Sequence, residues 1–145
     1  MSAALAMAWA GPARAAPMTG ARPMRECTIE DAATIEALRL GKKRLSIVVA
    51  SFQAPSPAAA AIVVRVVGGD GSRTEIARFG VHPPRPSRAG AEPERFLVSL
   101  EGNAALLHEG KPLCLEVAFE ASAGAVRGGA ADVRVEVVDL PGAPR

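Results

Sequence analysis

The sequence predicts an all-β protein, a single antiparallel β-sandwich of the jelly-roll or immunoglobulin-like kind, with at most one or two short helical turns. Short runs alternate apolar with polar residues, and Gly, Pro and charged residues separate them. The clearest runs are Ile76–Phe79, Phe96–Leu100 and Leu113–Phe119. The chain has 145 residues, 49% of them hydrophobic but only 3% aromatic, so we expect one domain with an aliphatic core.

Residues 1–16 have the pattern of a secretory signal. An apolar run, Ala3 to Ala10, is followed by Gly11-Pro12 and the small-x-small triplet Ala13-Arg14-Ala15. No Lys or Arg precedes the run, and we expect the basic segment to lie upstream; an Ala-rich disordered tail is the alternative. No apolar run is long enough to cross a bilayer. We therefore expect an exported protein, periplasmic or secreted.

The rest of the chain divides into a flexible N-terminal segment (17–33), a sandwich domain (34–140) and a tail (141–145). One stretch at the start of the domain is ambiguous. A capping residue, Thr28, and a good helical composition favour a helix over residues 28–40. The alternation within Thr34–Leu40 favours a strand, and that is our prediction.

Further strands follow from β-branched runs that end at Gly or Pro. They are Leu45–Phe52, Ile62–Val67, Thr74–Phe79 and Asp132–Val138. Gly68-Gly69-Asp70-Gly71 predicts a hairpin turn, since it lacks the Lys-Ser/Thr pair and the helix of a phosphate-binding loop. A helical turn is expected over Asn103–His108, packing Leu106 and Leu107 on the sheet.

Composition argues against several functions. The net charge is +2, and the Lys42-Lys43-Arg44 triplet has no interleaved aromatics, so nucleic acid is not an expected partner. Groups suited to catalysis are scarce, and we predict no enzyme activity. Glu116 and Glu120 are expected to be solvated and to form weak surface ion pairs, each contributing about 0–1 kcal/mol.

Two cysteines, Cys27 and Cys114, predict a disulfide, because an even count in an oxidising compartment favours pairing. A thiolate copper site is the alternative, but single, distant cysteines lack metal-ligand spacing. No cofactor is expected. Copper is the one candidate metal: His82 and His108 would be its ligands, with a methionine, Met18 or Met24, as a soft donor.

The order of pieces in residues 44–120 resembles the β-sandwich domain that follows the dicopper domain in tyrosinases and polyphenol oxidases. The resemblance is carried by short motifs: Ile76-Ala77-Arg78-Phe79-Gly80, the Pro-rich loop His82–Glu94, Phe96-Leu97-Val98-Ser99-Leu100, the Asn103–Leu107 turn, Gly110 and Leu113–Phe119. The chain departs from the family at Ser99, usually acidic, and at Glu120-Ala121-Ser122, usually Val-Pro. The family's copper centre uses a set of histidines on a helical bundle, and this sequence has only two.

In that family the sandwich covers or packs beside the active site. The resemblance therefore implies an exported, non-catalytic module that docks on or shields a separately encoded copper oxidase. A sheet face or the loop beginning His82-Pro83-Pro84-Arg85 would make the contact. Two alternatives stay open: a small periplasmic copper-handling protein, and a structural exported sandwich of unknown ligand.

Overall fold

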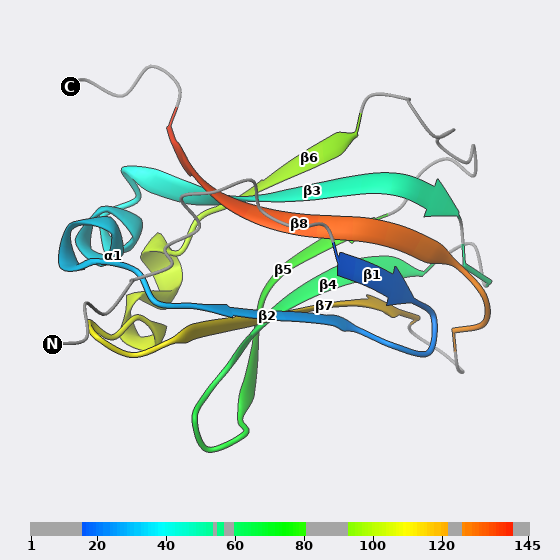
Figure 1. The fold of residues 1–145 in the computed structure, drawn as a ribbon, viewed down its shortest axis with the longest axis horizontal. Helices are drawn as coiled ribbons and strands as arrows, with labels where there is room; N and C mark the ends of the chain where they lie inside the picture. The colour runs from blue at the N-terminus through cyan, green and yellow to red at the C-terminus, as the bar shows by residue number, and fades with distance from the viewer. Residues whose placement is uncertain (1–15, 54, 57–59, 81–92, 122–125, 141–145) are drawn as a thin grey trace, which may run out of the picture.

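Two four-stranded antiparallel sheets face each other in the computed structural model (Figure 1). The structure describes residues 16–53, 55–56, 60–80, 93–121 and 126–140. The elements within these ranges are β1 (Ala16–Thr19), β2 (Met24–Thr28), α1 (Ala32–Arg39), β3 (Lys43–Gln53), β4 (Ala61–Val67), β5 (Arg73–Gly80), β6 (Glu94–Val98), the 3-10 helix η1 (Glu101–Leu106), β7 (Leu113–Glu120) and β8 (Ala130–Asp139).

The strand order selects one of the two predicted kinds of sandwich. The first sheet has the order β1-β8-β3-β6 and the second β2-β7-β4-β5, so the chain changes sheet repeatedly and its first and last strands pair. This is the arrangement of an eight-stranded jelly roll. An immunoglobulin-like sandwich places its first two strands side by side in one sheet, and here β1 and β2 lie in different sheets. The prediction of a sandwich is confirmed.

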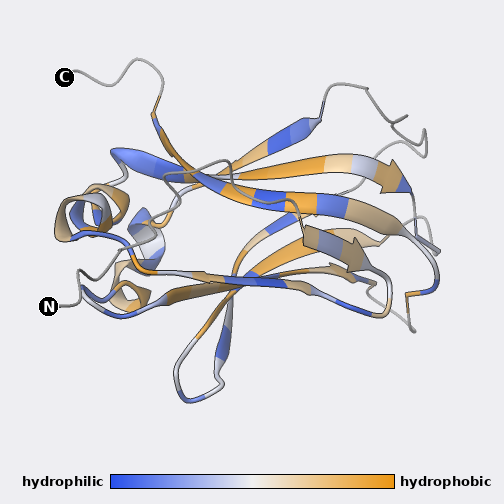
Figure 2. Ribbon diagram, in the orientation of Figure 1, coloured by the Kyte–Doolittle hydropathy of each residue, from blue (hydrophilic) through white to orange (hydrophobic). Residues whose placement is uncertain are grey.

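Aliphatic side chains fill the space between the sheets. On β7 and β8 every second residue points inward, which places Leu115, Val117, Val133 and Val135 in the core at 0% exposure. Figure 2 shows the resulting alternation of apolar and polar bands along β8. Phe52 and Phe119 lie 6.0 Å apart at the edge of this cluster. The predicted aliphatic core is therefore present, and the predicted strands at β3, β4, β5, β6, β7 and β8 are confirmed to within a few residues.

Residues 17–33 were expected to form a flexible segment, and the structure places much of this segment in regular strands. They contribute β1, which pairs with β8, and β2, which pairs with β7. Met18 and Met24 are inward-facing members of these strands, with 0% and 1% of their surface exposed. The edges of both sheets therefore depend on a segment whose sequence has little apolar alternation, because pairing with β7 and β8 supplies its hydrogen bonds.

The predicted strand over Thr34–Leu40 is wrong: the segment lies in α1. Asp31 caps the helix by accepting a hydrogen bond from the Thr34 amide at 2.7 Å. Gly41 ends it with a φ of +73°, donating to Leu38 while Lys42 donates to Ala37, a Schellman arrangement. The helical period, rather than the alternation, decides burial, since Leu38 is 0% exposed and Leu40 is 52% exposed.

Helix α1 and η1 close one end of the sandwich, where Figure 1 shows them side by side. Ile35 and Leu38 enter the core from α1, and Leu107 enters it immediately after η1, with Leu106 half-buried. The Arg39 guanidinium donates to the Leu107 carbonyl at 2.6 Å and joins the two elements. The predicted helical turn near Asn103–His108 is thus confirmed, and it begins two residues earlier.

Candidate functional site

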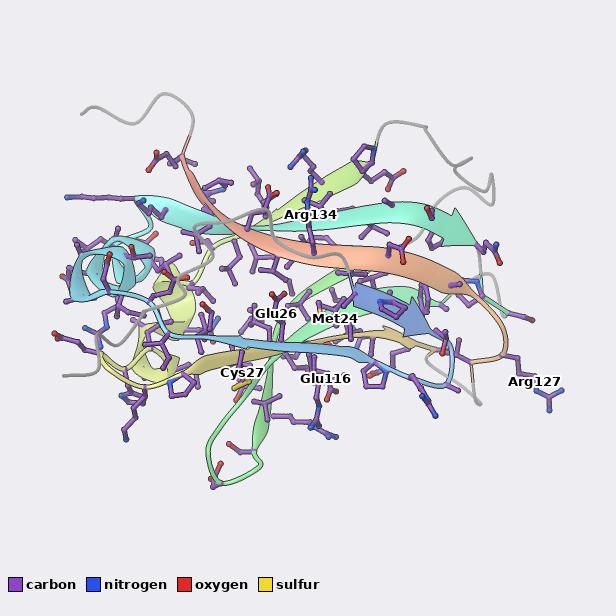
Figure 3. All side chains as sticks on the ribbon, viewed as in Figure 1. Met24, Glu26, Cys27, Glu116, Arg127 and Arg134 are labelled. Carbon is purple, nitrogen blue, oxygen red and sulfur yellow. A yellow bond between two sulfur atoms is a disulfide. The ribbon has the colours of Figure 1, made fainter. Side chains whose placement is uncertain are left out.

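A row of alternating charges crosses the outer face of the β2-β7-β4-β5 sheet. Arg25 on β2 is paired in register with Glu116 on β7, Glu116 with Arg65 on β4, and Arg65 with Glu75 on β5. Their neighbours along each strand face the core, so these four side chains point away from it. Figure 3 shows Glu116 on the outer side of the sheet and Met24 between the two sheets.

Glu116 lies at the centre of this row and is buried, with 5% of its side chain exposed. Arg25 reaches its Oε2 atom at 2.9 Å, and Arg73 of β5 reaches the same oxygen at 3.4 Å. Arg65 lies 4.0 Å from the other oxygen. The prediction that Glu116 is solvated is therefore wrong: the long arginine side chains fold over it.

A second group of charges continues along the same face. Glu120 accepts hydrogen bonds from Arg65 and, at 3.0 Å, from Arg78, which also donates to Glu75 at 2.7 Å. The bond from Arg65 first, and then that from Arg78, lower the pKa of Glu120 below its ordinary value. The same contacts with Glu120 and Glu75 raise the pKa of Arg78. Glu120 therefore forms surface ion pairs, as predicted, and these pairs belong to a network of several charges.

Charge is unevenly distributed over this face. Around Glu116, three guanidiniums (Arg25, Arg65 and Arg73) converge on one carboxylate. Around Arg78 the balance is reversed, because two carboxylates (Glu75 and Glu120) contact one guanidinium that is not shared with Glu116. The Glu116 end is therefore positive and the Arg78 end negative. Arginine stays protonated in proteins, so these guanidiniums can hold a charged group by hydrogen bonds but cannot take up or release protons.

The predicted disulfide lies on the same face. Cys27 and Cys114 occupy directly opposed positions on β2 and β7 and are bonded, which confirms the pairing. Each is two residues from a member of the charged row, Arg25 and Glu116 respectively, so the bond joins the two strands beside the positive end. Cys27 is exposed and Cys114 half-buried. The thiolate copper site is excluded for these two residues, because both sulfurs are in the bond.

The predicted copper and loop residues are not brought together in the part of the chain that the structure describes. His82, Pro83, Pro84 and Arg85 lie outside it. His108 is exposed, just after η1. Met18 and Met24 are core residues and offer no sulfur to a surface ion. Within the described ranges, no three His, Cys, Asp or Glu side chains are grouped so as to hold a metal ion.

A shallow hollow lies on the outer face of the other sheet. Its volume is about 80 Å³, and Val48, Ala50, Pro93, Asp132 and Arg134 line it. Such a volume holds only a few water molecules. Arg134 also contacts Glu136 at 3.0 Å, so its charge is already paired. We regard the charged face of β2-β7-β4-β5 as the stronger candidate.

Sequence reasoning did not identify Arg25, Arg65 and Arg73 as a group. The available signal was parity: Arg65 interrupts the apolar run of β4 at an outward position, and Glu116 does so in β7. Parity places each residue on the outer face but does not say which strands are neighbours. Pairing of β2 with β7, across more than eighty residues of chain, creates the cluster.

The described residues form an eight-stranded, disulfide-bonded β-sandwich with a row of charges on the outer face of one sheet. No protein-family model matches the chain, and no curated protein matches it. In the described residues, no helix is both long enough and apolar enough to cross a membrane.

Proposed function

We propose that this chain is an exported, non-catalytic binding module that docks on, or shields, a separately encoded copper oxidase of the tyrosinase type. The observation that carries the proposal is the order of elements from β5 to β7. Strand β5 ends in Phe79-Gly80, and β6, the short η1 turn, Gly110 and β7 follow in the order of the resembling oxidase domain. The Phe79 and Phe96 rings, from two of the quoted motifs, stack at 4.5 Å between the two sheets.

The chemistry of the outer face supports binding. Its converging groups are guanidiniums and carboxylates, which recognise opposite charges on another molecule through charge-assisted hydrogen bonds. They are spread over all four strands of a sheet. A face of this kind suits contact with a protein surface better than enclosure of a small molecule.

The disulfide supports export, since such bonds persist in oxidising compartments and are rare in the cytosol. The apolar segment expected to direct export, residues 1–16, lies outside the described residues except for Ala16, which begins β1. The tail, 141–145, lies outside them as well.

Capture of the partner tests the proposal. The affinity-tagged chain is expressed in the cells that produce it, recovered at physiological copper, and its companions are identified by mass spectrometry. We expect a copper oxidase whose phenol-oxidising activity is low in the complex and rises when the module is released. Recovery of the module without any copper oxidase, or release with no change in that activity, would contradict docking and shielding.

A further inference from the structure

We propose that the positive end of the outer face, formed by Arg25, Arg65 and Arg73 around Glu116, is the docking surface, and that it binds carboxylate side chains of an acidic segment on a partner protein. This inference rests on the proposed function in one respect, that the chain is a binding module. It does not depend on the partner being an oxidase.

Like charges converge at this end of the face. Nitrogen atoms of Arg25 and Arg73 lie 2.9 Å and 3.4 Å from the same oxygen, Glu116 Oε2, so the two guanidiniums are close neighbours. A nitrogen atom of Arg65 lies 4.0 Å from the other oxygen, Glu116 Oε1. Because Arg65 is also paired with Glu120, Glu116 is left to balance both Arg25 and Arg73, and one positive charge is in excess. A second anion placed between the arginines would therefore be attracted by the excess, most strongly where water is excluded.

Two of the three arginines are half-exposed and can be reached by a partner. The side chains of Arg25 and Arg73 are 53% and 50% exposed. In the described part of the chain both contact Glu116, and each guanidinium carries more N–H groups than this one contact uses. Arg65 is more buried and also donates to Glu120, so its role is to position the pair rather than to receive the partner.

The charges of the whole face select the kind of anion that can bind. The face already holds three carboxylates, and the fork of a guanidinium matches a carboxylate with two parallel hydrogen bonds. Glu75 and Glu120 at the other end of the face would repel a continuous polyanion such as a nucleic acid strand. A partner must therefore present its negative charge locally, as an acidic protein segment does.

Binding of a labelled hexaglutamate peptide, followed by fluorescence anisotropy at low and at physiological salt, tests the inference with the full chain alone. The test variant is Arg25→Gln/Arg73→Gln. The matched control is Arg95→Gln/Arg127→Gln, which removes the same charge from two exposed arginines outside this face. We expect the test variant to lose about tenfold or more in affinity, as charge-assisted hydrogen bonds predict, and the control to stay within about twofold.

A second variant guards against loss by misfolding. Glu116→Gln removes the carboxylate that competes with the peptide, so it should bind hexaglutamate more tightly than the wild type, a gain that unfolding cannot produce. The inference would be overturned if the wild type did not bind hexaglutamate, or if the two double variants lost affinity equally. It would also be overturned if Glu116→Gln bound the peptide no more tightly than the wild type, or if a single-stranded DNA of equal charge bound more tightly than the peptide. If a captured oxidase binds Arg25→Gln/Arg73→Gln as tightly as the wild type, this end of the face is not the docking surface, but the proposed function is not contradicted.

Discussion

Cys27 and Cys114 face each other across β2 and β7, with their Cα atoms 4.0 Å apart and a bond between their sulfur atoms. The bond fastens edge strand β2 to the interior of its sheet and closes a sequence separation of 87 residues. Strand β2 carries Arg25 to Glu116, so the same link holds the positive end of the outer face together. The stability of the fold and the geometry of the candidate site are therefore coupled.

Removing this bond should destabilise the protein strongly. For Cys27→Ser/Cys114→Ser we expect a loss of about 3–4 kcal/mol in the free energy of unfolding, because the unfolded chain regains the freedom of a long loop. Urea unfolding of both proteins under non-reducing conditions measures the difference. Non-reducing mass spectrometry of the wild type supplies the control, and two free thiols there would contradict the bond itself.

Helix α1 offers a matched pair of substitutions that separates burial from helix propensity. Leu38→Ala should cost about 2–5 kcal/mol, because it leaves a cavity where α1 closes the sandwich. Leu40→Ala, at the half-exposed C-cap, should change stability by less than about 1 kcal/mol. Thermal or urea unfolding of the two variants distinguishes them. Equal losses of stability in the two variants would mean that α1 does not pack as a helix with Leu38 facing the core.

Two glutamates should give opposite pH dependences. Burial first, and then the neighbouring Asp31, raise the pKa of Glu30, while Thr28 and Lys43 act against this shift. A raised pKa in the folded state means that the stability linked to Glu30 is present at low pH and is lost as pH rises through that pKa. Glu30→Gln should therefore raise the free energy of unfolding at pH 7 and have less effect in acid.

For Glu120 the sign is reversed. Hydrogen bonds from Arg65 and Arg78 lower its folded-state pKa, so its contribution is present above the unfolded-state value and is lost as pH falls through the folded one. Glu120→Gln should lower stability at pH 7, modestly because the side chain is partly exposed, and matter less near pH 3. Urea unfolding of both variants over this range is the measurement. If the free energy of unfolding changed with pH in the same way in both variants, the opposite pKa shifts of Glu30 and Glu120 would be refuted.

Copper binding separates the binding module from the copper-handling alternative. Because Met18 and Met24 are buried, only His82 and His108 of the predicted donors remain, and we expect no tight Cu(I) or Cu(II) binding. Titration of the wild type and of His82→Ala/His108→Ala, with a chelator competing for the metal, makes the measurement. Tight binding that the double variant loses would favour copper handling.

The sequence predicted an element correctly where the signal for that element lies within the segment itself. Alternation in β5, β6 and β7 and the β-branched runs in β3, β4 and β8 predicted these strands, since period and β-branched content are properties of the segment itself. The same reasoning failed at α1. There, alternation over a few residues mimicked a strand, and the Asp31 cap and the Gly41 terminator decided for a helix that can bury Ile35 and Leu38 together.

The sequence by itself determined the sandwich class, the aliphatic core and the cysteine pairing, because burial pattern and an even cysteine count can be read without knowing which strands are neighbours. Only the tertiary structure decided that residues 17–33 supply strands β1 and β2, that the sheets have jelly-roll order, and that Glu116 is buried beneath three arginines. The physical reason is that a strand's parity fixes the face on which a side chain lies, whereas its contacts depend on pairing between segments far apart in the chain.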